Sequence, residues 1–417
     1  MKIKDIIDQF IAGDWGEETC SNEMPCAVTC VRGADIIPIS EYNFSTIPIR
    51  YISQQSYSKK CLQVGDIIIE KSGGSPTQST GRVSFVSQEL LDSVGPVVCS
   101  NFCTAFRVKK GWNPLYVYYY FQFIYNLGLF FNFEGKTSGL KNLQLDAAFA
   151  AIPIDDVRES SQNKIVAVLQ GLEKKITINR RINQNLEAMA KQLYDYWFVQ
   201  FDFPNEEGKP YKSSGEVMVY NERLGREIPQ GWSTMPISEI LDKYPTTKRY
   251  ETKEYLSCGK YPIIDQSDSY IAGFTNEIDH LLTRHPAVLF GDHSTKVKFL
   301  DFDFARGADG TQILYSSNKA VSQYYLYLAV SALQIPNPGY SRHFKYLKEL
   351  PIIIPDLKIA NKFKNIVKPL FEEWTKNIFC NIELTKQSNE LLPLLMNGQV
   401  SVNSDLAVLY IIYGLKY

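Results

Sequence analysis

Apolar residues recur at alternating steps of four and three along two long stretches of the chain. One stretch runs from Ile165 to Trp197, and the other runs from Phe363 to Leu395. This spacing is the a/d seam of helices that pair as a coiled coil. Each stretch is therefore predicted to be a helix of about 32 residues, roughly 50 Å long at ~1.5 Å per residue.

Both seams contain two asparagines at their centre, where the pattern expects apolar side chains. They are Asn179 and Asn183 in the first helix and Asn377 and Asn381 in the second, and corresponding positions lie 198 residues apart. A proline ahead of each helix keeps the same offset. Two unrelated amphipathic helices are the alternative, but they would not explain the matching asparagines and prolines. We interpret the chain as an internal repeat.

The asparagines also predict how the helices pair. An antiparallel pair places Asn179 opposite Asn381 and Asn183 opposite Asn377, and a parallel pair would match them equally well. Buried amides pair with each other because an apolar neighbour would leave them without hydrogen bonds. Our hypothesis is that these four residues hold the register of the two helices.

Each predicted helix follows a larger segment in which short strand-like runs precede a helix with aromatic residues. The many Tyr and Phe residues, 26 and 23 in number, favour strands. The pattern predicts an α+β fold with two globular domains in tandem, each followed by a long helix. The predicted segments are 1–155 (first domain), 156–204 (central helix), 205–232 (linker), 233–356 (second domain), 357–397 (distal helix) and 398–417 (tail).

Length and composition restrict the class of protein. A chain of 417 residues is too long for one ordinary core. The N-terminal sequence MKIKDIIDQF lacks the apolar segment of a secretory leader, and no run of about 18 apolar residues could span a membrane. We expect a cytoplasmic protein with reduced cysteines. Because the net charge is −1, any basic surface must be local.

Metal and enzyme motifs are absent from the sequence. The gaps between Cys20, Cys26 and Cys30 do not suit zinc, and the four histidines have no paired spacing. No metal site is expected. The phosphate-binding motif G-x-x-x-x-G-K-[ST] does not occur. The tripeptide EGK occurs at 134–136 and at 207–209, but neither copy lies in a predicted strand that follows another acidic residue, as a metal-dependent nuclease would require.

The sequence NPLY at 113–116 is close to the Asn-Pro-Pro-aromatic turn of DNA adenine methyltransferases. Leu115 replaces the second proline, however, and no glycine-rich loop for a methyl donor accompanies the turn. The other interpretation is an Asn-Pro pair that starts a helix. A stand-alone DNA methyltransferase or nuclease is the alternative function, although the complete motif of neither enzyme is present.

Long parts of the chain resemble the specificity subunit of Type I restriction-modification enzymes. Residues 152–204 and 288–314 carry the resemblance, with shorter support from 228–232 and 390–400. It implies two target-recognition domains, each reading one half of a bipartite site on double-stranded DNA. It also implies that the two helices pair antiparallel, about a pseudo-two-fold axis, and set the spacer between the halves.

The same resemblance implies partners for this chain. The helices would dock two modification subunits, which carry the methyltransferase chemistry, and restriction subunits with translocase and nuclease activity would join them. No catalytic residue and no cofactor are then expected in this chain, because the methyl donor and ATP belong to the partner subunits. No membrane contact is expected.

Glycine-bearing polar loops are the candidates for contact with DNA. Arg, Lys, Asn, Gln, Ser and Thr side chains reach bases and phosphates, and glycine lets the backbone approach closely. Each candidate has an ordinary solvated loop as its alternative. The candidates are Lys71, Ser72, Thr77, Thr80, Arg82, Lys136, Thr137, Ser138, Lys141 and Asn142 in the first domain, and His293, Ser294, Thr295, Lys296, Lys298, Tyr340, Ser341, Arg342, His343 and Lys345 in the second.

Aromatic residues gather at the end of the first long helix. They are Tyr194, Tyr196, Trp197, Phe198 and Phe201. They are predicted either to pack onto a recognition domain or to contact a modification subunit.

Overall fold

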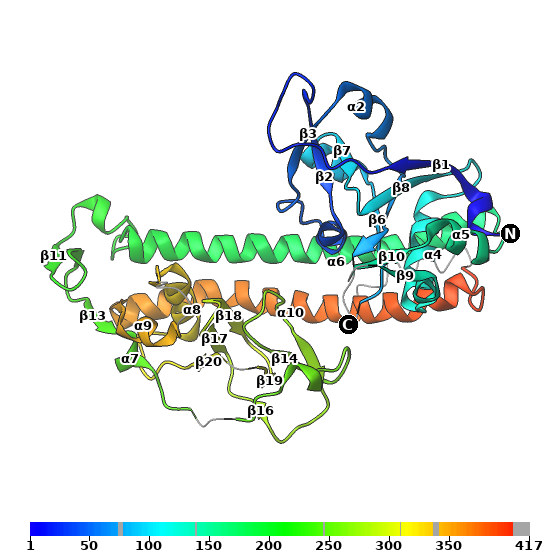
Figure 1. The fold of residues 1–417 in the computed structure, drawn as a ribbon. Coiled ribbons are helices and arrows are strands. Elements are labelled where there is room, and N and C mark those ends of the chain that lie inside the picture. The colour runs from blue at the N-terminus through cyan, green and yellow to red at the C-terminus, as the bar shows by residue number, and fades with distance from the viewer. Residues whose placement is uncertain (74–77, 138–139, 245–246, 309, 337–341, 403–417) are drawn as a thin grey trace. The chain divides into compact units, whose positions relative to one another are not determined.

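The computed structural model describes residues 1–73, 78–137, 140–244, 247–308, 310–336 and 342–402. The chain divides into two compact units: unit 1 is Met1–Ile178 with Asn381–Tyr417, and unit 2 is Asn179–Cys380. Both units include parts of two long helices, α6 (Glu159–Tyr194) and α10 (Leu357–Met396) (Figure 1). Two mixed domains, each followed by a long helix, confirm the predicted fold class. The exact domain boundaries stay predictions.

Unit 1 is organised around a sheet with the strand order β1-β8-β4-β6, in which all neighbours are antiparallel. A second sheet has the order β3-β2-β7. The strands are β1 (Ile7–Ala12), β8 (Cys103–Val108), β4 (Ile67–Glu70), β6 (Val83–Phe85), β3 (Ile49–Ile52), β2 (Cys26–Val31) and β7 (Val97–Cys99). The short helices are α1 (Ile36–Ser40), α2 (Gln54–Lys60), α3 (Gln88–Val94) and α5 (Leu145–Ala151).

Strand β4 shows why its sequence is a continuous apolar run. Ile67 and Ile69 enter one hydrophobic cluster, and Ile68 between them enters another. Successive side chains of a strand point to opposite faces. The run of isoleucines therefore marks a strand that is covered on both sides.

Helix α4 (Pro114–Asn126) packs its aromatic side chains into the same cluster as Ile67 and Ile69. The Asn113 side-chain oxygen accepts the Leu115 N–H at 2.9 Å, and Pro114 stands at the first helical position. Both are standard features of a helix start. The NPLY sequence is therefore a helix cap in this structure.

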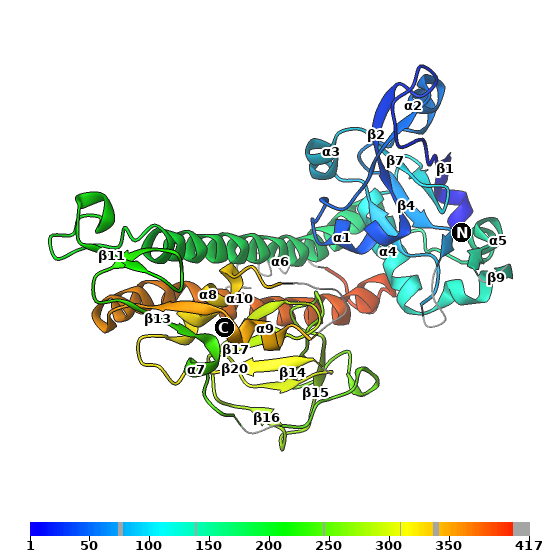
Figure 2. The same cartoon turned by 60° about the vertical axis from the view of Figure 1, so that its left-hand side comes forward.

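Unit 2 contains a sheet with the order β18-β17-β20 and a second sheet with the order β15-β14-β19-β16. Figure 2 labels β17 and β20 of the first sheet and β14, β15 and β16 of the second. The strands are β18 (Val297–Leu300), β17 (Ala287–Gly291), β20 (Thr311–Leu314), β15 (Gly273–Thr275), β14 (Tyr261–Ile264), β19 (Phe304–Arg306) and β16 (Leu281–Leu282). Two further strand pairs are β11 (Met218–Asn221) with β12 (Arg226–Pro229), and β13 (Ser233–Pro236) with β21 (Pro351–Ile354). The helices are α7 (Ile237–Ile240), α8 (Gln323–Ala332) and α9 (Phe344–Glu349).

The two units repeat one topology. The order β8-β4-β6 in unit 1 corresponds to β20-β17-β18 in unit 2. In both, the central strand pairs with the strand that follows its loop and with the strand that precedes an aromatic helix, α4 or α8. A short helix, α5 or α9, and then a long helix follow. The repeat predicted from the helix seams therefore includes the domains.

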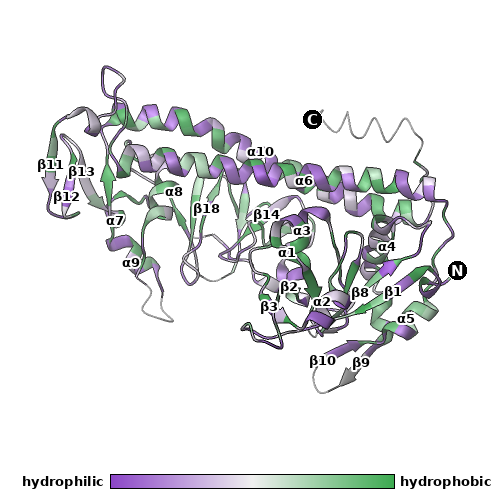
Figure 3. Ribbon diagram, turned by 90° about the horizontal axis from the view of Figure 1, so that it is seen from above, coloured by the Kyte–Doolittle hydropathy of each residue, from purple (hydrophilic) through white to green (hydrophobic). Residues whose placement is uncertain are grey.

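The long helices pair through their apolar seams, and each unit shows one part of the pairing. In unit 1, Ile165 and Leu169 near the start of α6 share a cluster with Leu392 and Leu395 near the end of α10. In unit 2, residues at the end of α6 share a cluster with Phe363 at the start of α10. Hydrophobic and hydrophilic residues alternate along both helices (Figure 3). The helices are thus antiparallel.

Of the central asparagines, Asn183 and Asn377 are buried and Asn381 is partly buried, and all three form hydrogen bonds. In unit 2, the Asn377 amide donates to the Asn183 side-chain oxygen at 2.9 Å, and the Asn183 amide donates to the Trp374 carbonyl at 3.0 Å. In unit 1, the Asn381 amide donates to the Ile176 carbonyl at 3.3 Å. Asn179 is also buried. The expected Asn183–Asn377 pair is present, and its role in register stays a hypothesis.

The aromatic residues at the end of α6 mostly belong to a core. Tyr194, Trp197, Phe198 and Phe201 are buried in the cluster that also contains Phe363, whereas Tyr196 is 38% exposed. These four residues are part of the hydrophobic core of unit 2. Within the described residues, no helix is long and apolar enough to cross a membrane.

A tyrosine of each aromatic helix donates a hydrogen bond to a glutamate of α6. Tyr119 donates to Glu173 at 2.6 Å in unit 1, and Tyr327 donates to Glu187 at 2.7 Å in unit 2. Burial raises the pKa of the Glu173 carboxyl to about 7, although the Tyr119 hydrogen bond acts in the opposite direction.

We predict that Asn377→Leu destabilises the protein by about 1–3 kcal/mol, because the Asn183 oxygen would face an apolar side chain. The double variant N183L/N377L should recover most of this loss, since both polar groups are then removed. Urea unfolding of the full chain measures both. Asn185→Leu, at an exposed position of α6, controls for the added apolar side chain. Equal stability of N377L and the unchanged chain would show that the buried bond contributes nothing.

We also predict that stability falls as the pH rises from about 4.5 to about 7. Glu173 binds its proton more tightly when folded, with a pKa of about 7, than at the ordinary value of 4.5. Its contribution is therefore complete below pH 4.5 and is lost as the pH passes the folded pKa, by roughly 3 kcal/mol at most. Urea unfolding between pH 5 and 8 should show this slope, and Glu173→Gln should reduce it. Glu159→Gln, at the exposed start of α6, is the control. An unchanged slope in E173Q would contradict the assignment.

Candidate DNA interface

The two candidate loops of unit 1, residues 71–82 and 134–142, are joined by a small sheet. Strand β5 (Ser72–Gly73) pairs with β10 (Leu140–Leu143), which also pairs with β9 (Glu134–Thr137). The Ser72 hydroxyl donates to the Asn142 side-chain oxygen, and the Leu143 N–H donates to the Lys71 carbonyl at 2.8 Å. Two loops that are far apart in the sequence thus form one surface element.

Glu134 connects these two loops. Its carboxylate accepts both the N–H and the hydroxyl of Thr80, at 2.6 and 3.0 Å, and lies 3.5 Å from the Lys141 ammonium. Lys141 also donates to the Gln78 carbonyl at 3.1 Å. The Glu134 side chain is only 5% exposed, so removing its charge would leave buried donors without a partner.

Arg82 is held by a second buried acid. Its Nε and Nη2 donate to the Glu70 carboxylate at 2.9 and 2.6 Å, and this hydrogen bonding raises the pKa of Arg82. Gly73 has a φ of +143°, and a Cβ atom there would lie 2.9 Å from the Glu70 carboxylate. Glycine is therefore required where the loop crosses this ion pair.

The candidates of unit 1 thus occupy different environments. Thr80 is fully buried, Arg82 and Lys141 are committed to internal partners, and Lys71, Ser72 and Asn142 are half-buried. Lys136 and Thr137 lie in β9, whereas Thr77 and Ser138 lie outside the described residues. The buried members act first as supports of the loop pair, and their contact with DNA stays a prediction.

Unit 2 also joins its two candidate loops, and again through an acid. Asp292, in the loop between β17 and β18, accepts the Phe344 N–H on its carboxylate at 2.8 Å. Its carbonyl accepts the His343 N–H at 2.8 Å. Asp292 is 3% exposed. The loop that starts at Asp292 and the start of α9 therefore form one element, as the corresponding loops do in unit 1.

A tightly packed hairpin presents the first of these loops. The Gln266 side-chain oxygen accepts the N–H groups of His293 and Ser294 at 3.0 and 3.3 Å, and Thr295 has a φ of 56°. His293 and Lys296 are exposed, and Lys296 pairs with Asp268 at 2.8 Å. Ser294 and Thr295 are half-buried.

The remaining candidates of unit 2 divide into exposed and buried groups. Arg342 and Lys345 are exposed, and Lys345 lies 4.6 Å from the centre of the Tyr346 ring. His343 is buried, with Nδ1 at 3.0 Å from the Asp292 carbonyl. Lys298 donates to the Ser269 carbonyl, and burial lowers its pKa to about 8. Tyr340 and Ser341 lie outside the described residues.

Glu134, Asp292 and Glu70 were not among the residues predicted to contact DNA. The predicted residues are mostly basic, hydroxyl or amide side chains, because such groups contact nucleic acid directly. The signal for the missed residues was an acid at the border of, or inside, a loop otherwise rich in basic and hydroxyl side chains. Their role depends on which N–H groups the fold brings near them. Groups of acidic, histidine and cysteine residues that could hold a metal ion are absent from the described part of the chain.

The chain is similar to known proteins over most of its length. The model of the family described as Type I restriction modification DNA specificity domain matches residues 33–188 and again 229–384. The MjaIX specificity subunit of Methanocaldococcus jannaschii is 26% identical over 314 residues, which is 66% of this chain and 69% of that protein. The EcoR124I/EcoR124II specificity subunit of Escherichia coli is 28% identical over 149 residues, 33% of this chain and 36% of that protein.

A solved structure shares the fold of this chain. The crystal structure of the S subunit of a Type I restriction-modification system from M. genitalium matches with a TM-score of 0.51 at 13% sequence identity. The match covers 95% of each chain. Two tandem mixed domains with two long helices are therefore an arrangement seen in a solved structure.

We predict that Arg342→Ala weakens DNA binding, because Arg342 is exposed beside the backbone that Asp292 holds. If Arg342 contacts a base, its loss should cost about 1–3 kcal/mol of binding free energy and relax specificity at one position of the site. If it contacts a phosphate, the slope of the logarithm of the binding constant against the logarithm of salt concentration should become about 0.9 less steep. Titration of the full chain with duplex DNA at several salt concentrations measures both. Arg223→Ala, exposed in the turn between β11 and β12, is the control. If R342A and R223A bind equally well, this loop is not at the DNA.

Proposed function

Because the chain belongs to the family of Type I restriction modification DNA specificity domains, we propose that it directs a partner methyltransferase to a bipartite DNA site. The family is one of recognition subunits without catalysis of their own. Each domain would read one half of the site in double-stranded DNA. The observation that carries this proposal is the repeated loop pair: in both units, two loops beside the central strand are joined by backbone hydrogen bonds.

The proposed reading surface combines fixed backbone with exposed polar side chains. His293, Lys296, Arg342 and Lys345 are exposed on the loops that Asp292 joins in unit 2. Side chains of these types hydrogen-bond to base edges in the major groove and to phosphates. Loops held by buried acids lose little conformational freedom on binding, which favours specificity.

The paired helices would set the spacer between the half-sites. Their seams are antiparallel, and the Asn183–Asn377 bond lies inside unit 2. A slip of one heptad would displace one helix along the other by about 10 Å, which is roughly three base pairs. The buried amides would therefore exclude registers that change the spacer.

Two modification subunits would dock on the helices, and restriction subunits with translocase and nuclease activity would join them. Ile182 and Met189 of α6, and Tyr196 in the π-helical turn Asp195–Val199 that follows it, are spaced by seven and are 39%, 53% and 38% exposed in unit 2. Residues seven apart share a helix face, and such an apolar face is suited to a partner subunit. The methyl donor and ATP would bind to the partners, so this chain would need no cofactor. The complex would act in the cytoplasm.

We predict that inserting four residues into α10, about one helical turn, lengthens the spacer by about two base pairs and leaves the half-sites unchanged. The four residues add about 6 Å of helix. Genome-wide mapping of methylated bases in cells that carry the complete enzyme measures both half-sites and spacer. The same insertion after Glu207, in an exposed polar turn, is the control and should change neither.

Two outcomes would contradict the proposal. Altered half-sites with an unchanged spacer would show that the helices do not set the distance. Methylation by the purified chain with a methyl donor, but without modification subunits, would show that the chain is itself an enzyme.

A further inference from the structure

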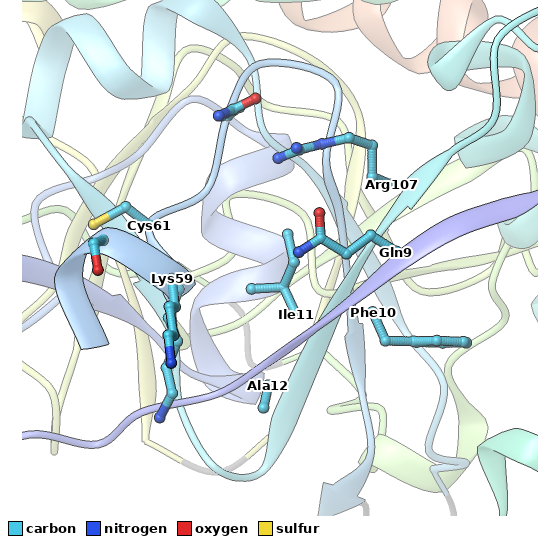
Figure 4. A pocket seen from close by; sticks show the side chains of 10 residues that line it. Gln9, Phe10, Ile11, Ala12, Lys59, Cys61 and Arg107 are labelled. Carbon is cyan, nitrogen blue, oxygen red and sulfur yellow. The ribbon is translucent and has the colours of Figure 1, made fainter. Parts of the chain in front are cut away.

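A surface hollow of about 550 Å³ lies in unit 1 between the edge strand β1 and the end of α2 (Figure 4). Residues of β1, α2, β8 and the turn after α2 line it. The polar lining residues include Gln9, Lys59, Lys60, Gln63 and Arg107. None of them was among the candidates identified from the sequence.

Arg107 is held in one orientation at the wall of this hollow. Its Nε and Nη2 donate to the fully buried Asp66 carboxylate at 2.8 and 2.9 Å. Asp66 also accepts the backbone N–H of Gln63. A guanidinium has five N–H donors, and those of Nη1 have no partner in the described part of the chain. Gln9 lies opposite Arg107 in the β1–β8 register, and Figure 4 shows both side chains extending toward the same space.

Of the two neighbouring lysines that line the hollow, Lys59 is the one available to bind an anion. Its neighbour Lys60 donates to the Asp14 carboxylate at 2.9 Å and to the Gly13 carbonyl at 3.3 Å. Lys59 is exposed, and it forms no ion pair with any described residue. None of the described residues that line the hollow is acidic. The hollow therefore offers an ammonium, spare guanidinium donors and two carboxamides. The carboxylate of Asp8 on β1 is exposed and acts electrostatically on Arg107, but it is not part of the lining.

We propose that this hollow is a phosphate-contact site for the DNA backbone beside the half-site that unit 1 reads. The inference rests on the proposed DNA-binding function and adds a site to it. Phosphate oxygens accept from Lys, Arg and Gln donors without regard to base sequence, and such contacts orient a protein on its duplex. The hollow is open at the surface and can receive a backbone segment.

The position of the hollow suits a duplex that also meets the candidate loops. Arg107 lies four residues along β8 from Cys103, and Cys103 is the register partner of Glu70, where the 71–82 loop begins. Four residues of a strand span about 13 Å, which is close to the ~12 Å width of the major groove. A flanking phosphate can therefore reach the hollow while the groove faces the loops.

The test compares Lys59→Ala with Lys4→Ala in the full chain. Lys4 is exposed in the same unit but does not line the hollow. Affinity for random-sequence duplex and for the specific site is measured across a range of salt concentrations. We expect K59A to weaken both about three- to tenfold, and to lower the salt slope by about 0.9, while K4A changes neither. Amine-reactive labelling of the unchanged protein should show that duplex protects Lys59 and not Lys4.

Three results would overturn the proposal. K59A and K4A could bind alike, which would remove the hollow from the DNA contact. K59A could weaken only the specific site with an unchanged salt slope, which would make Lys59 a base reader. Inorganic phosphate could protect Lys59 where duplex does not, which would make the hollow a site for a free anion. Binding to random-sequence duplex tests the hollow without depending on sequence recognition. The proposed function is tested separately, and it is wrong if the unchanged protein shows no preference for a bipartite site.

Discussion

An apolar seam on a helix needs a second helix to cover it, and in this protein the second helix comes from the other half of the chain. Near its start, α6 shares a hydrophobic cluster of unit 1 with Leu392 and Leu395 from the end of α10. Near its end, α6 shares a cluster of unit 2 with Phe363 and Val367 from the start of α10. Each unit is therefore built from both helices. The core of the first domain is complete only when the last helix has been added.

Buried polar groups favour one register of the helices and one conformation of the loops, which apolar packing alone would leave undefined. Apolar surfaces tolerate sliding, whereas a buried amide or carboxylate loses free energy unless its partner is in place. The Asn183–Asn377 bond and the Tyr119–Glu173 and Tyr327–Glu187 bonds are of this kind. Glu134 and Asp292 have the same effect at the loops, because each joins two segments that the sequence separates. We therefore expect the register of α6 against α10 and the shape of the candidate loops to depend on a small number of buried polar groups that have found their hydrogen-bond partners.

The candidate interface was predictable only in part, and the reason is physical. Loop composition selected segments that the fold brings together in each unit, and their contact with DNA stays a prediction. Composition could not separate Arg342, which is exposed, from Lys298 and Arg82, which are committed to internal partners. Exposure and pairing of a basic side chain depend on acids and carbonyls from distant strands, as with Glu70 and Ser269. The hollow at Lys59 and Arg107 had no sequence signal, because its walls come from separate elements.

The sequence by itself determined the plan of two domains, each followed by a long helix. The period of the apolar residues and the offset between the two repeats can be read directly along the chain. The steps of four and three, the matched asparagines and the 198-residue offset are all readable without a fold. The same asparagines could not choose between parallel and antiparallel helices, since both directions align them. The family resemblance implied an antiparallel pair, and the tertiary structure shows the direction itself by placing the start of α6 against the end of α10. The direction of α10 relative to α6 depends on which hydrophobic core each end of each helix completes. Those cores are built from contacts between residues that are far apart in the chain.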